Sequence, residues 1–243
     1  MKKSVKSLLL VLAGALVMVG AGMLTSCHPN YGEVTDKALT IGAYDAIDVS
    51  NGIEIVMSAD IAAPVLTADE MILDKVRVEV ENGTLVIELQ DMLFNAYIKK
   101  LKVVLPLNPE LNKVRASGAS CVKVKGNVPL NDLHLSGASL ADIDATADMK
   151  KIKLSGASIA EIAGLGDKVE IEISGSSILN AKDLLVSEVK GDVSGASIID
   201  VTVCTKLAVD ASGASIINYG LVSPSCNVEL DCDLSGASEI YKR

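Results

Sequence analysis

The sequence predicts an all-β protein, most of which is a right-handed parallel β-helix, a solenoid whose chain winds through successive stacked rungs. Two observations lead to the solenoid. The tetrapeptide Ser-Gly-Ala-Ser occurs six times, and its variant Ser-Gly-Ser-Ser once, typically every 19 residues. On both sides of each copy, apolar residues alternate with polar or charged ones, which is the pattern of a half-buried strand. No part of the repeat region shows a helical period of 3.6 residues, so each unit is expected to hold two short strands.

The recurring tetrapeptide, here called the SGAS motif, lies between the two expected strands of each unit. Glycine at a bend adopts backbone conformations that other residues disfavour and allows close approach of a neighbouring chain. Serine hydroxyls can bond to local backbone or along the stack. We therefore interpret the motif as a structural ladder. Its copies begin with Ser117 and Gly118, Ser136 and Gly137, Ser155 and Gly156, Ser174 and Gly175 (where Ser replaces Ala), Ser194 and Gly195, Ser212 and Gly213, and Ser235 and Gly236.

Stacking the units reveals columns of equivalent residues. The positions one and three before the motif are mostly apolar and are expected to face the core. Two columns are polar and are expected to face outward. The column two residues before the motif holds Arg115, His134, Lys153, Glu172, Asp192, Asp210 and Asp233; the column three residues after it holds Lys123, Asp142, Glu161, Asn180, Asp200, Asn218 and Tyr241.

The length of the unit favours a solenoid over other repeat architectures. A unit of about 19 residues cannot bury its apolar face alone and must stack on its neighbours. Extended residues rise ~3.3 Å each, so one unit traces a loop of roughly 60 Å, which suits a rung, and rungs stack ~4.8 Å apart. A propeller, in which two units would form one blade of about 40 residues, is the alternative.

The first 26 residues have the features of a lipoprotein signal peptide. Three lysines precede an apolar run from Leu8 to Leu24, and Leu24-Thr25-Ser26-Cys27 resembles the bacterial lipobox, in which the cysteine is lipidated and becomes the new amino terminus. Acyl chains on Cys27 would hold the domain on a membrane without a spanning helix. Removing residues 1–26 takes away three lysines and lowers the net charge from −9 to −12.

Between this anchor and the repeat, the chain is expected to be a tether followed by irregular rungs. Residues 27–38 are assigned to the lipid anchor and tether, and residues 39–115 to β-rich rungs and a cap, continuous with the SGAS-repeat β-helix of residues 116–243. Residues 76–89 predict a hairpin with a type I′ turn at Asn82-Gly83. Only five residues follow the last motif, and an edge so poorly covered favours end-to-end association.

Composition excludes several partners. The acidic excess of the domain disfavours nucleic acid and anionic lipid headgroups, which are bound through an excess of lysine and arginine. One Phe, five Tyr and no Trp provide little for a glycan cleft built on stacked rings. Among the four later cysteines, Cys226 and Cys232 are the closest pair in sequence, but Cys232 occupies an apolar column and is better interpreted as a small buried residue. Cys121 and Cys204 leave other pairings open.

No residue pattern predicts catalysis or a cofactor. Hydrolysis through serine requires a paired base, and the two histidines are His28, beside the anchor, and His134, on an outward column. Asp142 and Glu161 are expected to be neighbours ~5 Å apart if the rungs are in register, and with Asp200 they are weak candidates for Ca²⁺. A retaining glycosidase needs a similar carboxyl separation. A solvated polar face explains the same residues, and we expect no metal site.

The stretches GIEIVMSAD, VEVENGTLVIEL, LKVVLPLNPELNKVRASGAS and INYGLVSPSCNVELDCDLSGASEI, together with the serial motifs, resemble the head GIN domain family of putative auto-transporter adhesins over Ile47 to Arg243. The resemblance implies a right-handed β-helix in a Gram-negative envelope lipoprotein and brings no catalytic residues with it.

We therefore expect a lipid-anchored, non-enzymatic protein of the outer membrane, facing the periplasm or the cell surface, that displays a repetitive face to a glycan or protein ligand of the envelope. The alternatives are a structural envelope protein that self-associates end to end and a polysaccharide-processing β-helix enzyme.

Overall fold

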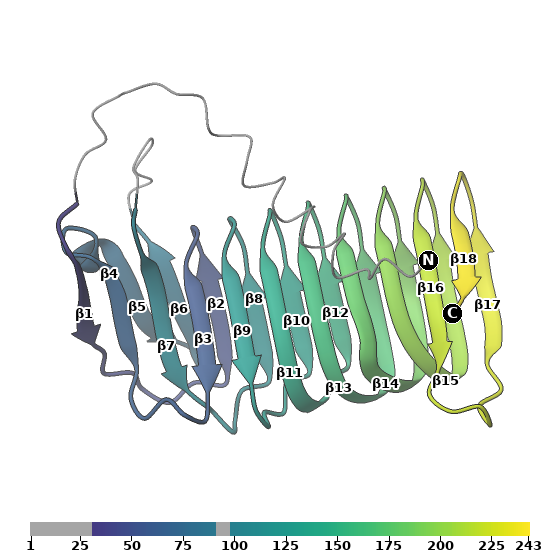
Figure 1. Cartoon of the computed structure of the whole chain (residues 1–243), viewed down its shortest axis with the longest axis horizontal. Coiled ribbons are helices and arrows are strands. Elements are labelled where there is room, and N and C mark those ends of the chain that lie inside the picture. The colour runs from purple at the N-terminus through teal and green to yellow at the C-terminus, as the bar shows by residue number, and fades with distance from the viewer. Residues whose placement is uncertain (1–30, 91–97) are drawn as a thin grey trace, which may run out of the picture. The chain divides into compact units, whose positions relative to one another are not determined.

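The computed structural model describes residues 31–90 and 98–243, without the side chains of 145–148, and these residues form an all-β fold (Figure 1). A single short 3-10 helix, Leu73–Lys75, occurs among them. The strands are β1 (Val34–Ala38), β2 (Ala46–Ser50), β3 (Glu54–Ser58), β4 (Val65–Asp69), β5 (Val76–Glu81), β6 (Thr84–Leu89), β7 (Leu101–Pro106), β8 (Lys113–Ala116), β9 (Cys121–Lys125), β10 (Asp132–Leu135), β11 (Leu140–Asp148), β12 (Lys151–Leu154), β13 (Ile159–Ile173), β14 (Ile178–Val193), β15 (Ile198–Ala211), β16 (Ile216–Leu221), β17 (Glu229–Leu234) and β18 (Glu239–Lys242).

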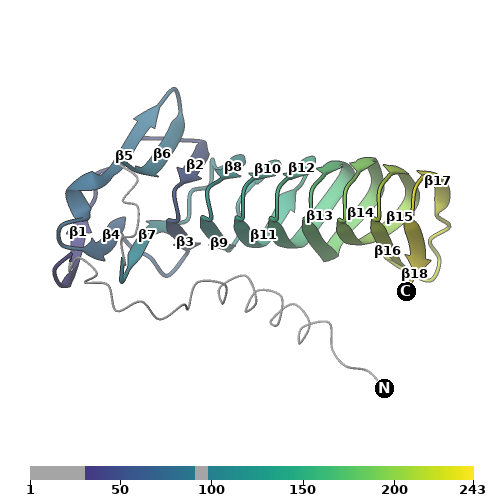
Figure 2. The ribbon, with the colours of Figure 1, turned by 90° about the horizontal axis from the view of Figure 1, so that it is seen from above.

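The repeat region is a parallel β-solenoid, as the sequence predicts. Each rung has a first leg before the SGAS motif and a second leg after it, and each leg pairs in parallel with the same leg of the neighbouring rungs. Figures 1 and 2 show the rungs stacked in chain order from β8 and β9 to β17 and β18. The strands β13, β14 and β15 are long because pairing continues around the bend from one leg to the next. The propeller alternative is wrong, because the units stack in register rather than forming separate blades.

The columns of equivalent residues found in the sequence are aligned in register in the structure. Leu133, Ile152 and Ile171 follow one another in register and are fully buried, whereas the residues one position further along each strand are at least partly exposed. Burying one such side chain contributes about 1.5–3 kcal/mol. The core therefore consists of apolar residues from both legs, packed between them along the stack.

The SGAS motifs form the corners between the two legs. All seven motif glycines have positive φ, between 61° and 80°. In each of the later five corners, an added Cβ would lie 2.3–2.5 Å from the carbonyl oxygen of the preceding motif glycine. The backbone N–H of the residue after the glycine in the next corner donates a hydrogen bond of 2.7–2.8 Å to that same oxygen. Ser176 N, for example, donates to Gly156 O. Glycine is required here by backbone conformation and by close stacking.

The rungs before the first SGAS motif do not stack in chain order. β2 and β3 form a rung that pairs in parallel with β8 and β9 on one side and with β6 and β7 on the other. The chain therefore leaves the stack after β3, passes through β4 and β5, and returns to add β6 and β7 outside the rung it made first. The sequence does not reveal this order, because all these strands carry similar alternation.

The tether assignment differs from the structure where it can be compared. Of residues 27–38, Val34–Ala38 form β1, which pairs antiparallel with β4. All five side chains of β1 are exposed, so the strand is held mainly by backbone hydrogen bonds and carries no apolar alternation that would reveal it. The anchor itself, Cys27, lies outside the described residues.

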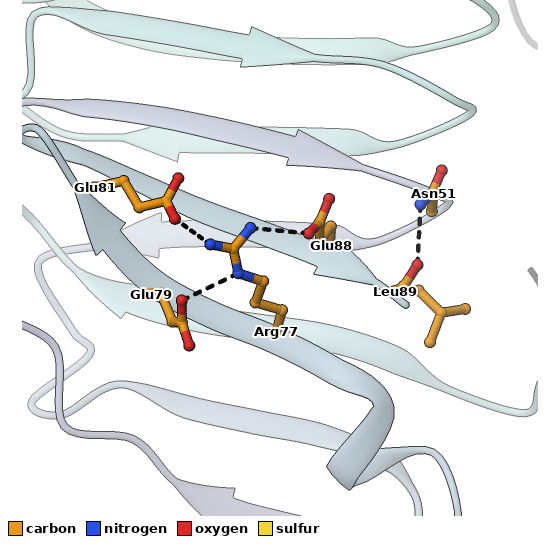
Figure 3. A network of polar contacts seen from close by, with 6 residues as sticks. All are labelled: Asn51, Arg77, Glu79, Glu81, Glu88 and Leu89. Atoms are coloured by element: carbon orange, nitrogen blue, oxygen red, sulfur yellow. Dashed lines mark hydrogen bonds and ion pairs between the residues drawn. The ribbon is translucent and has the colours of Figure 1, made fainter. Parts of the chain in front are cut away.

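The hairpin predicted at Asn82-Gly83 is confirmed. β5 and β6 pair antiparallel, and both turn residues have positive φ. Arg77 on β5 contacts three carboxylates, those of Glu79, Glu81 and its cross-strand partner Glu88 (Figure 3). These contacts raise the pKa of the Arg77 guanidinium above its usual value, through hydrogen bonds to Glu88 first and then to Glu79.

At the β2–β3 corner, Asn51 Nδ2 donates a 3.0 Å hydrogen bond to the carbonyl oxygen of Leu89, at the end of β6 (Figure 3). The outer rung is thereby tied to the corner of the rung it covers.

The disulfide is between Cys204 and Cys226, so Cys226 does not pair with Cys232. The connection from β16 to β17 is longer than in earlier rungs, and it runs beside β15, where Val222 N donates to Val203 O. This places Cys226 next to Cys204, with their Cα atoms 4.9 Å apart. Cys232 is a free, partly buried thiol in the inward column of β17, and burial raises its pKa. No helix in the described residues is long and apolar enough to cross a membrane.

Candidate binding groove

A groove of about 590 Å³ runs along the first legs, beside the SGAS corners. We call it the serine groove. It crosses six rungs, which at ~4.8 Å per rung gives a length of about 24 Å. Two rows of side chains line it: the outward column Asp48, Arg115, His134, Lys153, Glu172 and Asp192, and the first serines of the motifs, Ser117, Ser136, Ser155, Ser174 and Ser194.

The stacking of identical corners explains why serines line the groove. In the five motifs from 136 to 215 the fourth serine is buried and donates to the carbonyl oxygen of the first, as Ser158 Oγ does to Ser155 O at 2.8 Å. This bond closes the corner. The first serine remains partly exposed on the groove side, and its hydroxyl is available in each rung from 117 to 194.

Along the groove, Asp48 at one end is followed by a positive stretch and then by a negative end. Arg115 and Lys153 stand on the earlier rungs, and Glu172 and Asp192 on the later ones. Glu172 contacts Lys153 and also Lys151, at 2.9 Å. Hydrogen bonds from Lys151 and then Lys153 lower the pKa of Glu172 to about 2. The exposed side chains of Arg115 and Asp192 form no ion pair within the described residues, so they remain free for a ligand.

His134 stands among charged groups on the positive side. Its Nε2 lies 3.7 Å from Asp132 Oδ1, while Lys113 Nζ lies 2.7 Å from Asp132 Oδ2. Burial lowers the pKa of His134, and the nearby cations Lys113, Lys153 and Arg115 lower it further against the opposing effect of Asp132. The imidazole is therefore neutral at pH 7.

The groove contains serines and a histidine, but not a paired nucleophile and base. Ser136 follows His134 by two residues on the same side of the strand, yet no hydrogen bond joins them within the described part of the chain. Nucleophilic serine requires a base within hydrogen-bond reach. The arrangement is suited to holding a ligand by hydroxyls and charges.

The second outward column is placed on the other leg. Asp142 and Glu161 are register neighbours on β11 and β13, as expected. Glu161 accepts a long hydrogen bond of 3.4 Å from Asn180. Asp200 lies two register steps beyond Glu161, where Arg243 Nε contacts its carboxylate at 2.6 Å. The side chains and backbone described by the structure contain no group of three or more His, Cys, Asp or Glu arranged to hold a metal ion.

One groove residue was missed by the sequence reasoning. Asp48 belongs to a rung without the SGAS motif, but β2 pairs with β8 so that Asp48 is the register partner of Arg115. The signal was present, because Ile47-Asp48-Val49 repeats the apolar-charged-apolar pattern of Val114-Arg115-Ala116. What could not be read was which rung would lie beside β8.

The charged and hydroxyl-bearing columns along one leg of a parallel β-solenoid define the chain as a β-solenoid protein with a repetitive surface. The profile of the family described as "Putative auto-transporter adhesin, head GIN domain" matches residues 43–220. The chain belongs to this family.

Solved structures support the fold. A putative adhesin from Bacteroides fragilis is 17% identical, with a TM-score of 0.73 over 91% of this chain and 100% of that one. A putative adhesin from Parabacteroides distasonis is 18% identical, with a TM-score of 0.66 over 88% and 98% of the two chains. A putative lipid binding protein from the same species is 21% identical, with a TM-score of 0.66 over 87% and 97%. No protein with a curated description matches this chain.

Proposed function

We propose that the protein is a lipid-anchored, non-enzymatic binding module of the cell envelope, which uses the serine groove to hold an extended ligand. The observation that carries the proposal is the groove itself, which presents one charged or polar side chain per rung over six rungs and a serine hydroxyl on five of them. A ligand lying along the axis meets a further serine hydroxyl about every 4.8 Å from Ser117 to Ser194. Membership of the adhesin family supports a binding role over catalysis.

The ligand class follows from the groups that line the groove. Hydroxyls and unpaired charges favour a polar polymer bearing its own hydroxyl and charged groups, such as an envelope glycan or an extended polar segment of a protein. The scarcity of aromatic residues favours weak contacts repeated along the groove over one tight ring-stacking site. Lipidation of Cys27 in the outer membrane would present this surface to the periplasm or to the outside of the cell.

Binding is tested with arrays of envelope glycans and extended polar peptides, comparing single groove variants with a matched control. R115A and D192A each remove an exposed charge without an ion pair within the described residues, so the fold should persist. E161A removes an exposed charge from the second leg. Loss of array binding in R115A and D192A, with full binding in E161A, supports the proposal. Equal binding by all three variants contradicts it.

Location and anchoring are tested in cells. Incorporation of a labelled fatty acid that disappears in C27S supports the lipid anchor, and unchanged incorporation contradicts it. Protease treatment of intact cells then separates the two faces of the membrane: release of the domain indicates the cell surface, and protection indicates the periplasm.

A further inference from the structure

The last rung of the solenoid has an open edge. β17 pairs with β15 and β18 with β16, and within residues 31–90 and 98–243 no strand pairs with the other edge of either. The inward-facing Leu230 and Leu234 are 47% and 40% exposed, whereas their register partners Leu207 and Ala211 are 0% and 2% exposed. Free backbone groups beside uncovered apolar side chains are a template for another strand.

The charges on β17 disfavour a second copy of the same edge. Glu229, Asp231 and Asp233 alternate with the inward residues and point outward. Lys206 contacts Glu229 and Asp231, each at 3.1 Å, but Asp233 forms no ion pair among the described residues. Two copies paired antiparallel around a two-fold axis would set these carboxylates against one another, and like charges directly opposite destabilise a strand pair. The edge therefore discourages self-pairing.

The stack contains a precedent for pairing outward carboxylates with lysines across two strands, on the edge of β13 that faces the preceding rung. β13 carries outward Glu170 and Glu172, and its neighbour β12 carries outward Lys151 and Lys153. Lys151 contacts both glutamates, at 3.3 Å and 2.9 Å, and Lys153 contacts Glu172. The inward Ile152 and Leu154 continue the core. An acidic-apolar strand is thus paired in this fold by a basic-apolar strand.

We propose that the outer edge of β17 binds an extended segment of a partner protein in which lysine or arginine alternates with apolar residues. The segment adds one further strand to the stack. Its backbone pairs with β17, its apolar side chains cover Leu230, Cys232 and Leu234, and its cations face Asp231 and Asp233. This is β-strand addition, in which backbone bonds provide affinity and alternate side chains provide specificity. The site is separate from the serine groove.

The probe is a fluorescent peptide with the sequence of residues 149–155, MKKIKLS, titrated against the full chain purified in mild detergent and followed by anisotropy. D233K reverses a carboxylate on the open edge. D192K reverses another exposed carboxylate of the same column, two rungs away and lining the serine groove. Neither aspartate has an ion pair among the described residues, so neither change should unfold the protein. Two control peptides are used: MEEIELS, with reversed charge, and KKMILKS, with the same composition and no alternation.

We expect the alternating peptide to bind the parent chain, to bind D233K at least tenfold more weakly and to bind D192K as it binds the parent. Both control peptides should bind at least tenfold more weakly. A larger loss in D192K would place the peptide in the serine groove and overturn the proposal. Equal binding of KKMILKS would show unspecific charge attraction and overturn it, and so would light scattering that shows a dimer whose formation excludes the peptide.

Discussion

Substitution of Gly175 by alanine tests the stacked-corner geometry most directly. Gly175 has a φ of +78°, which costs an L-residue about 1–2 kcal/mol. An added Cβ would also lie 2.3 Å from Gly156 O and 3.0 Å from Gly156 N, so the two rungs must separate. Separation weakens the 2.7 Å bond from Ser176 N to Gly156 O, which contributes about 1 kcal/mol, and disturbs the packing below it. We expect G175A to lower the free energy of unfolding by about 3–5 kcal/mol.

Gly52 is the matched control. It turns the β2–β3 corner with a φ of +79°, but an added Cβ there meets no atom within 4 Å. G52A therefore carries the conformational cost alone, about 1–2 kcal/mol. The assay is urea unfolding of both variants and the parent, followed by circular dichroism of the β-sheet signal. If G175A and G52A shift the midpoint equally, close stacking does not contribute and the explanation of the repeat is wrong.

Three further predictions follow from individual contacts. C226S opens the disulfide to Cys204, which closes a loop with a sequence separation of 22; it should cost about 3 kcal/mol in urea unfolding under oxidising conditions, and parent-like stability would contradict this. His134 should titrate below 6.5 by NMR, and K153A should raise its pKa because a repelling cation is removed; a fall would contradict the electrostatics. In the parent protein the pKa of His134 is lower in the folded state than in the unfolded state, so the unfolded state binds the proton more tightly. Lowering the pH through 6.5 should therefore reduce the free energy of unfolding. S158A removes a buried hydroxyl whose bond closes a corner and should cost about 1 kcal/mol, measured as a urea midpoint shift; an unchanged midpoint would show that the bond does not contribute.

Much of the solenoid was readable because its pattern is local and repeated. The alternation around Lys153 predicts that Ile152 and Leu154 face inward, and both side chains are buried in the structure. The spacing of the motifs places His134 beside Lys153, and the register pairs them. Each rung buries its apolar face on a copy of the same pattern, so a single unit defines the register of the next.

The candidate site was only partly readable for the same reason. The serine groove contains the charged column that the sequence identifies, from Arg115 to Asp192. Its volume depends on how far the corners extend beside that column, and its end depends on Asp48. Neither property is contained in the spacing of the motifs.

The sequence by itself determined the rung length, the two legs, the inward and outward columns and the need for glycine at each corner, since these depend on alternation and on backbone sterics within one unit. Only the tertiary structure decided that the rung of β2 and β3 lies between β8 and β6, that Cys204 pairs with Cys226, and that β17 presents an open edge. Strands with the same alternation are interchangeable as neighbours, so contacts such as Lys123 with Glu54, 69 residues apart, are selected by the packing of the whole stack.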